Sequence, residues 1–554
     1  MVIRLIILLT ILWGSLLFSS NADTLYILHT TDVHGQIYPY DYYHDTPANN
    51  SLAHIYNRIV EYRKNHNNVM LLDGGDLIQG SPFSHYFNMI ENSVLHPIIL
   101  TMNYMGYDAF AVGNHDIEQG LPVYESLRRQ SHFPWLSANG VLDDGRTYFE
   151  PYTIVKRNGI RVGIIGLTTP AIPMWLDSTL YPGINWKDMV KSAKNYARKL
   201  RPKVDLLVGL FHAGFEEAYS AGQTKALGLP NENASLLVAK ALPQFDIIFA
   251  GHSHREVVSS DIQFTKNNKS QHRLELDGKS TLLINSGARA HNLGVTRIIL
   301  RMEENHSDRW QIISKAGWLE KVVDFQPSIA IKRLLQSHHK KTLTYIRNPI
   351  AQTLDTLSSK HARFKDTPFV ELINRAQMHH TRTDISFAAV FNDRFVLEPG
   401  PIRVKDVYNM YWYENFLYTL KMSGKQIKDF LEYSANYYQL SDDTLTTNPQ
   451  MAGFNYDMAE GLQYTIDVSK TPGERISTII HLKTQKPLNP DSLYTVAMNS
   501  YRATGGGGHL AAAGIQQPSI IYKSTVQIRT ILIDYLKNKK IIHARADNNW
   551  RIIH

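Results

Sequence analysis

Residues 109–117 read Ala-Phe-Ala-Val-Gly-Asn-His-Asp-Ile, so an amide, an imidazole and a carboxylate directly follow a short apolar run. Short apolar runs that end in polar or glycine residues are typical of buried strands. Four further clusters follow apolar runs of their own: Asp32-Val33-His34, Asp73-Gly74-Gly75-Asp76, Phe211-His212-Ala213 and Gly251-His252-Ser253-His254. In α/β sheets, ligands bind just beyond the carboxyl ends of the strands. The five clusters therefore predict one shared site.

Helical patterns alternate with these strand candidates. Residues 51–65 carry Leu52, Ile55 and Ile59 on one helical face, and residues 94–105, 186–200 and 234–242 are further helix candidates. The Asn158-Gly159 pair predicts a hairpin turn between strands at 152–156 and 160–167. Because strands and helices alternate, the sequence predicts an α/β layered domain.

A second domain is expected because 554 residues exceed the size of one ordinary core. The pattern changes after about residue 325, and residues 329–345 have the composition of a polar, basic helical connector. The remaining chain has helix candidates at 369–379 and 424–438, strand candidates at 462–468, 476–482 and 493–498, and a glycine-rich loop at 504–508. We predict a catalytic domain at 23–325, a helical linker at 326–347 and a second α/β domain, which binds the substrate, at 348–554.

Residues 1–22 have the pattern of a secretory signal peptide: Arg4, an apolar core from Leu5 to Phe18, and the cleavage motif Ser20-Asn21-Ala22. This pattern predicts a periplasmic or secreted protein that has no membrane anchor after cleavage. The sequence has no cysteine, so any metal site must use His, Asp, Glu and Asn. The formal net charge is +8, but no long Lys or Arg tract is present. The charge therefore favours a basic solvated surface over the binding of a nucleic acid polymer.

The residue types of the five clusters fit a site for two divalent ions, which share one carboxylate ligand. Asp32 and His34 lie on one loop and can hold one ion, and Asp76, which follows two glycines, is the natural bridge. The other candidate ligands are Asn114, His212, His252 and His254. His and Asp together favour manganese, zinc, cobalt or iron over calcium. We interpret the clusters as a hydrolytic site in which a bridging hydroxide attacks phosphorus.

His115 lies next to Asn114 but is not needed as a ligand, so we predict that it donates a proton to the leaving oxygen. A catalytic histidine of this kind needs a carboxylate to orient it. Asp116 and Glu118 are both close in sequence, and the spacing alone does not choose between them.

These motifs resemble those of calcineurin-like metallophosphoesterases: TTDVHG (30–35), DGGDLIQGSP (73–82), GNHDIEQG (113–120), FHAG (211–214) and GHSH (251–254). More narrowly, they resemble the 5′-nucleotidase superfamily, whose members join a four-layer β-sandwich flanked by helices to a C-terminal substrate-binding domain. The resemblance implies that Asp32, His34, Asp76 and His254 bind one metal ion, and that Asp76, Asn114, His212 and His252 bind the other. It makes His115 the catalytic histidine, and the family's partner carboxylate, an Asp three residues on, falls on Glu118.

Within the superfamily, several segments resemble bacterial periplasmic 2′,3′-cyclic-nucleotide 2′-phosphodiesterase/3′-nucleotidases: DYYHDTP (41–47), TPAIPMW (169–175), GFNYDMAEGLQYTIDVS (453–469) and NSYRATGGGG (499–508). Residues 388–394 lack the double glycine of the 5′-nucleotidases. By this resemblance, Phe454 and Tyr501 clamp the nucleobase, and Asn499 and Arg502 contact ribose or phosphate. We interpret Tyr411, Tyr413 and Phe416 as packing residues.

We therefore expect a secreted phosphohydrolase with two divalent metal ions. It would convert 2′,3′-cyclic nucleotides to 3′-nucleotides, and these to nucleoside and phosphate. Its expected partner is the nucleotide substrate, and its expected state is a monomer. One alternative is a 5′-nucleotidase/UDP-sugar hydrolase. A second alternative, from another class, is a catalytically dead nucleotide-binding surface protein.

Overall fold

The computed structural model describes residues 22–92, 95–260, 273–303, 306–442 and 444–554. The expected signal peptide therefore lies outside the described residues, apart from Ala22. No helix within the described ranges is long and apolar enough to cross a membrane.

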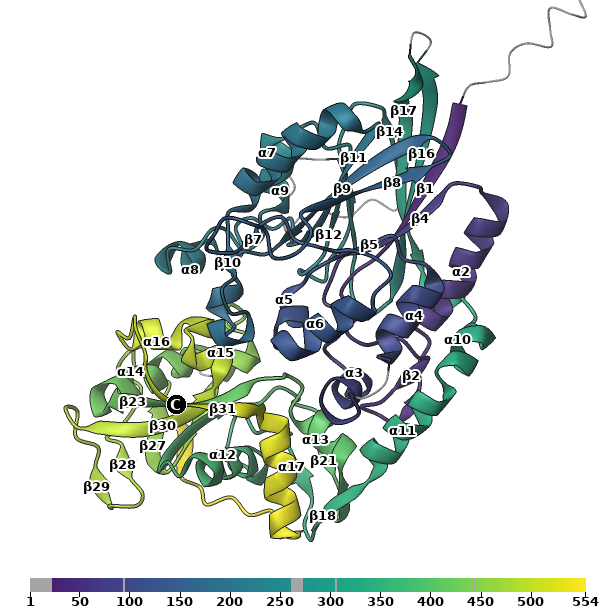
Figure 1. Cartoon of the computed structure of the whole chain (residues 1–554). Coiled ribbons are helices and arrows are strands. Elements are labelled where there is room, and N and C mark those ends of the chain that lie inside the picture. The colour runs from purple at the N-terminus through teal and green to yellow at the C-terminus, as the bar shows by residue number, and fades with distance from the viewer. Residues whose placement is uncertain (1–21, 93–94, 261–272, 304–305, 443) are drawn as a thin grey trace, which may run out of the picture.

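Two sheets lie face to face in the N-terminal half of the chain (Figure 1). The seven-stranded sheet has the order β14 (Arg273–Asp277), β17 (His306–Lys321), β16 (Asn292–Glu303), β1 (Ala22–Thr30), β4 (Val69–Asp73), β5 (Ala109–Ala111) and β6 (Trp135–Leu136). The six-stranded sheet has the order β13 (Glu256–Ser259), β15 (Leu282–Ser286), β12 (Ile247–Ala250), β11 (Leu206–His212), β9 (Ile160–Thr168) and β8 (Tyr152–Arg157). Leu25 and Met70 of the first sheet share one core with Val162 and Val208 of the second.

Helices cover the outer face of each sheet. Successive side chains of a strand point to opposite faces, so Ile27 packs between the sheets while Leu28 joins a core beneath the helices. The helices on that side are α2 (Leu52–Asn65), α4 (Pro97–Met105) and α6 (Leu121–Gln130), and those on the other sheet are α7 (Met189–Leu200) and α9 (Ser235–Ala241). This arrangement confirms the predicted four layers.

The predicted elements are correct in type, but several of their ends shift. The hairpin at Asn158-Gly159 forms as predicted, and both residues have the positive φ of a type I′ turn. The helix expected at 186–200 begins only at Met189, because the Asp188 side chain accepts the Lys191 N–H and so caps it. The strand expected at 476–482 is reduced to β28 (Ile480–His481).

The C-terminal half has its own sheet and its own core. Helices α10 (Ile329–Leu334) and α11 (Gln336–Arg347) lead to it. Its five-stranded sheet has the order β26 (Asp457–Glu460), β20 (Ile385–Ala389), β30 (Leu493–Asn499), β23 (Phe416–Ser423) and β31 (Ser519–Gln527). The main helices are α12 (Pro368–Thr381), α14 (Gly424–Ala435), which ends before the predicted 438, and α17 (Ile528–Lys539). Residues between 350 and 550 form the buried part of this core.

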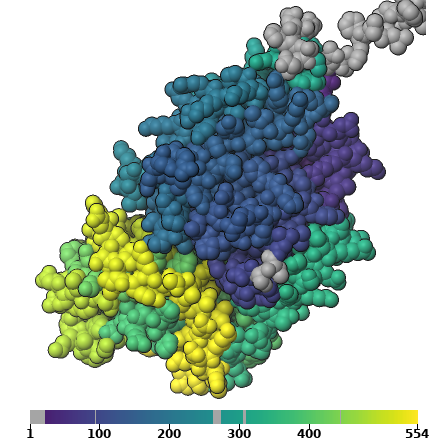
Figure 2. All heavy atoms as spheres, viewed as in Figure 1, coloured from purple at the N-terminus to yellow at the C-terminus, as the bar shows by residue number. Residues whose placement is uncertain are grey.

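The two halves touch beside the predicted site (Figure 2). Gln119 donates from Nε2 to Glu414 Oε2 at 3.1 Å, and the Thr504 hydroxyl donates to the Met174 carbonyl at 3.1 Å. Loops of the C-terminal half therefore reach the edge of the sheets that carries the polar clusters.

Candidate active site

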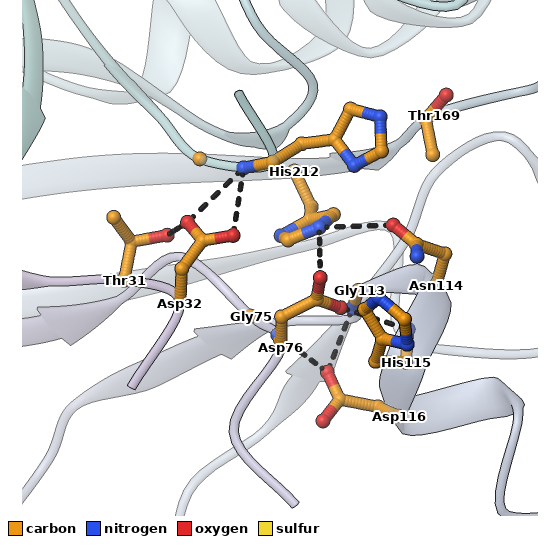
Figure 3. A network of polar contacts seen from close by, with 12 residues as sticks. Thr31, Asp32, Gly75, Asp76, Gly113, Asn114, His115, Asp116, Thr169 and His212 are labelled. Atoms are coloured by element: carbon orange, nitrogen blue, oxygen red, sulfur yellow. Dashed lines mark hydrogen bonds and ion pairs between the residues drawn. The ribbon is translucent and has the colours of Figure 1, made fainter. Parts of the chain in front are cut away.

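The five polar clusters meet at one edge of the paired sheets, and Figure 3 shows Asp32, Asp76, Asn114 and His212 together there. Strands β1, β4 and β5 run parallel in one sheet, and β11 and β12 run parallel in the other. Each strand is followed, at or just after its last residue, by one of the clusters. The structure therefore brings all seven predicted metal ligands together.

Six of these residues form two groups of potential ligand atoms. Asp32, His34 and His254 form one group, and Asp76, His212 and His252 form the other. Within each group the nitrogen and oxygen atoms lie within 4.8 Å of one another. The Asn114 Oδ1 atom joins the second group, 3.2 Å from His212 Nε2. The donor set of carboxylate, imidazole and amide groups fits first-row divalent metals.

The imidazole rings are turned so that one nitrogen of each is available to a metal ion. His34 Nδ1 faces the Gln79 carbonyl at 3.2 Å, which leaves Nε2 only 3.0 Å from His254 Nε2. His212 Nδ1 donates to the Gly74 carbonyl at 2.7 Å, which leaves Nε2 3.1 Å from Asp76 Oδ2. Such hydrogen bonds fix the tautomer and the orientation of metal-binding histidines. Burial, followed by the charge of His254, lowers the pKa of His34 to about 3. This shift favours the neutral imidazole, which is the form that binds a metal ion.

The ligand loops are held in a backbone conformation that few residues adopt. Asp32, His34, Asp76, His252 and His254 all have φ between 50° and 70°. Such left-handed conformations cost free energy in residues other than glycine, and they cluster at functional sites. Close packing adds to this constraint, since a Cβ atom at residue 113 would lie 2.1 Å from Asp76 Oδ1.

Glu118, and not Asp116, contacts the predicted catalytic histidine. Glu118 Oε2 lies 2.5 Å from His115 Nδ1, so Nε2 is left free to face a substrate. Burial opposes protonation of His115, but the charges of Asp76 and Glu118 outweigh it and raise its pKa to about 10. These two carboxylates thus favour the protonated form of the imidazole, which is the form that a proton donor needs.

Of the two carboxylates that the sequence left open, Asp116 does not orient His115, because its carboxylate accepts hydrogen bonds from the backbone. It accepts the N–H groups of Asp76, Leu77, Ile78 and Gly113 at 2.9 to 3.2 Å. Asp116 therefore holds the Asp76 loop in place beside α5 (Asn114–Ile117), which begins at the same glycine.

Two of the four substrate contacts predicted in the C-terminal half are wrong. Arg502 is 1% exposed, and its guanidinium is taken up by Asp457, Asn455 and the Phe454 and Gly506 carbonyls. Asn499 caps α15 (Ser500–Ala503) by accepting the Arg502 N–H at 2.8 Å. Both residues shape the glycine-rich loop and do not face a ligand.

The two aromatic residues of the predicted base clamp are not fully buried. Phe454 is 38% exposed and Tyr501 is half-buried. A cavity of about 860 Å³ extends from His34, His115 and His254 to Trp412 and Tyr413 of the C-terminal half. Tyr411 is buried, as expected of a packing residue, whereas Tyr413 is 44% exposed and lines the cavity, although its ring also meets Phe391 edge-on. The cavity is large enough to hold a nucleotide-sized ligand.

Comparisons with known proteins find a match for a segment in each half of the chain. The family model described as calcineurin-like phosphoesterase matches residues 25–256, and the model described as 5′-nucleotidase, C-terminal domain matches residues 348–514. The chain joins a calcineurin-like phosphoesterase domain to a 5′-nucleotidase C-terminal domain. The phosphoesterase domain carries all the predicted metal ligands, and these matches support a metal-dependent phosphoric ester hydrolase.

Relatives with both domains cover nearly the whole chain. The trifunctional nucleotide phosphoesterase protein YfkN of Bacillus subtilis is 30% identical over 95% of this chain. The match covers only 39% of the length of YfkN. The 2′,3′-cyclic-nucleotide 2′-phosphodiesterase/3′-nucleotidase of Haemophilus influenzae is 27% identical over 96% of the chain and 88% of the relative. The fold matches the structure of a putative 5′-nucleotidase from Staphylococcus aureus, with a TM-score of 0.77, 24% identity, and coverage of 96% of this chain and 99% of that one.

Glu232 of the phosphoesterase domain is a site residue that the sequence did not reveal. It is 3% exposed, and its Oε1 lies 2.8 Å from His252 Nε2 while its Oε2 accepts from the Ser220 hydroxyl. A carboxylate on the free nitrogen of a metal-binding histidine fixes the ring and raises its basicity. Glu232 lies in the loop before α9, between two asparagines, where no pattern marks it.

We expect Glu232→Gln to weaken metal binding at the His252 group by about 10- to 100-fold. Glutamine keeps the size of the side chain but loses the charge that supports the imidazole. Titration of the metal-free protein with Mn²⁺ in competition with a chelator measures the effect. Glu217→Gln, in the same segment but paired with Lys240, is the matched control. An unchanged affinity in the Glu232 variant would show that this carboxylate does not support the ligand.

Proposed function

We propose that the chain is a secreted phosphohydrolase with two divalent ions, of manganese, zinc, cobalt or iron. It hydrolyses 2′,3′-cyclic nucleotides to 3′-nucleotides, and these to nucleoside and phosphate. The observation that supports this proposal most is the position of His115, which pairs with Glu118 and lines a cavity together with His34 and His254 of one metal-ligand group. Its backbone N–H donates to Asp76 of the other group at 2.8 Å. The cyclic-nucleotide specificity rests on the relatives from Haemophilus influenzae and Salmonella typhimurium, which carry that name.

In this proposal the residues act in three ways. Asp32, His34 and His254 would hold one ion, Asn114, His212 and His252 would hold the other, and Asp76 would serve as the ligand shared by both. The bound ions would supply an acidified water as the nucleophile and stabilise the phosphoryl charge. His115, in its protonated form, donates its Nε2 proton to the leaving oxygen of the nucleoside, and Glu118 keeps the ring turned toward that oxygen.

The proposal extends to the rest of the chain. We place the catalytic domain at 23–325, the helical linker at 326–347 and the substrate-binding domain at 348–554. The protein would act as a monomer in the periplasm or outside the cell, after removal of residues 1–22. Its partner would be the nucleotide, with no nucleic acid polymer and no membrane.

A turnover assay with added Mn²⁺ or Zn²⁺ tests this function directly. We expect 2′,3′-cyclic AMP and 3′-AMP to be hydrolysed faster than 5′-AMP. A preference for 5′-AMP would instead favour a 5′-nucleotidase, the name carried by a Vibrio cholerae relative that is 25% identical over 88% of the chain. No turnover of any nucleotide would favour a catalytically dead binding protein.

We propose that Phe454 and Tyr501 clamp the nucleobase. Stacking of one base on an aromatic ring contributes about 1–3 kcal/mol, so alanine at either position is expected to raise the KM for 3′-AMP about 5- to 150-fold. The hydrolysis of glycerol 2-phosphate, which has no base, should be unaffected. Tyr522→Ala removes a ring that is 41% exposed on β31 and serves as the control. Equal losses with both substrates would contradict the clamp.

A further inference from the structure

An exposed arginine lines the active-site cavity, and the proposed mechanism does not use it. Arg289 lies in the loop between β15 and β16, and its side chain lines the cavity together with His34, His115 and His254. The nearby sequence, Gly287-Ala288-Arg289-Ala290, carries no recognised motif. The position of Arg289 is therefore visible only in the folded chain.

The Arg289 loop is attached to the first metal-ligand loop. The Arg289 N–H donates to the Asp32 carbonyl at 2.7 Å, and the Asn50 side chain donates to the Arg289 carbonyl at 2.7 Å. Arg289 and Ala290 both have a φ of 53°, the same left-handed conformation as most of the ligand residues. Two consecutive residues other than glycine in this conformation are costly, and such strain is retained where it positions a functional group.

The charge of Arg289 is not neutralised by a neighbouring carboxylate. Among the described residues, no carboxylate forms an ion pair with its guanidinium, and Asp41 is the one acidic side chain that lines the cavity with it. Asp41 is already occupied, since its Oδ2 lies 2.6 Å from His44 Nδ1. The cavity therefore holds an uncompensated positive charge beside the predicted metal ions.

The charge of Arg289 also affects the pKa values of two other residues that line the cavity, His291 and Tyr413. Burial and then the Arg289 charge lower the pKa of His291. Burial raises the pKa of Tyr413 on the opposite wall, and the Arg289 charge partly offsets that rise. Arg289 thus lines one cavity with His34 of the metal-ligand loop and with Trp412 and Tyr413 of the C-terminal half.

We propose that Arg289 binds the phosphate of the substrate and favours dianionic phosphomonoesters over monoanionic diesters. This inference rests on the proposed function, and it assigns Arg289 mainly to the second hydrolysis, that of the 3′-nucleotide. The second pKa of a phosphate monoester is about 6, so at pH 8 the monoester carries nearly two negative charges. A guanidinium offers paired N–H donors to phosphate oxygens, and one fixed cation attracts the dianion more strongly than the monoanion.

Steady-state kinetics of Arg289→Ala test the inference. We expect the KM for 3′-AMP to rise about 10- to 100-fold, since hydrogen bonds to charged groups are lost. The KM for 2′,3′-cyclic AMP should rise several-fold less, and kcat for either substrate should change little. Arg289→Lys should recover part of the affinity, because it restores the charge without the paired donors.

Arg382→Ala is the matched control. Arg382 is an exposed arginine with a φ of 58°, but it caps the end of α12, away from the cavity. A second measurement does not depend on turnover: 3′-AMP should raise the thermal unfolding temperature of the wild type and of Arg382→Ala, and raise it less in Arg289→Ala. Equal KM values for Arg289→Ala and the wild type with both nucleotides would overturn the inference.

A failure of this inference is distinguishable from a failure of the proposed function. 4-Nitrophenyl phosphate is a dianionic monoester and bis(4-nitrophenyl) phosphate a monoanionic diester, and neither is a nucleotide. If the wild type hydrolyses these esters but no nucleotide, the proposed function fails while the role of Arg289 is still measured. In that case Arg289→Ala should lower the ratio of kcat/KM for the monoester to that for the diester. An unchanged ratio would overturn the inference.

Discussion

Asp76→Asn is expected to lower kcat/KM for nucleotides by more than about a thousandfold, because two ions would lose the one charged ligand that they share. The structure gives the physical reason. Asp76 Oδ2 lies 3.1 Å from His212 Nε2, its Oδ1 accepts the His115 N–H at 2.8 Å, and the carboxylate is 1% exposed. Asparagine keeps these distances but carries no negative charge. Metal analysis of the purified variant should show less bound metal than in the wild type.

Asp73→Asn is the matched control for this substitution. Asp73 belongs to the same motif, but burial raises its pKa to about 8, so at neutral pH it is largely in its uncharged form. Its oxygens accept from the Thr30 hydroxyl and the Gly75 N–H and do not face the ligand groups. We expect this variant to keep its metal and most of its activity. If Asp76→Asn retained wild-type activity, or if both variants lost it equally, Asp76 would not be the shared ligand.

His115→Ala is expected to lower kcat for 3′-AMP by about 10²- to 10⁴-fold while leaving metal content unchanged, since a general acid contributes that much to the rate. The loss should be smaller with 4-nitrophenyl phosphate, because its leaving group is stable without a proton. This difference between substrates separates the loss of a proton donor from a general disturbance of the site. Rate measurements with both substrates, together with metal analysis, provide the check.

Glu118→Gln should reproduce part of this effect, and His132→Ala, on an exposed loop, should have none. Glutamine at 118 can hold the His115 ring, but it removes the charge that favours the protonated imidazole. Full activity of His115→Ala with 3′-AMP would contradict its assignment as the proton donor.

The metal-ligand groups were predictable because the same sequence pattern, an apolar run followed by polar residues, occurs five times. Each of the five clusters follows an apolar run that is long enough to form a buried strand, and the ends of parallel strands meet at one edge. The layered α/β arrangement followed from the same alternation of strands and helices, and the four-layer order was implied by the family resemblance. Element ends were less predictable, since they depend on contacts such as the Asp188 cap that no periodicity encodes.

The choice between Asp116 and Glu118 needed the structure of one short helix. In α5, residues three apart lie on the same face, so Glu118 meets His115 while Asp116 points toward the Asp76 loop. The error at Arg502 has a different cause. Its partner, Asp457, lies 45 residues away in sequence, so that only the folded chain shows the charge to be already paired. Glu232 and Arg289 were missed because each stands alone in a loop without a motif.

The most direct test of the two-ion site is a crystal structure of the Mn²⁺-loaded protein, measured at the manganese absorption edge. The account predicts two anomalous peaks, one bounded by Asp32, His34 and His254 and the other by Asn114, His212 and His252. The Asp76 carboxylate should lie between the two peaks. A single peak, or two peaks without the Asp76 carboxylate between them, would contradict the two-ion account.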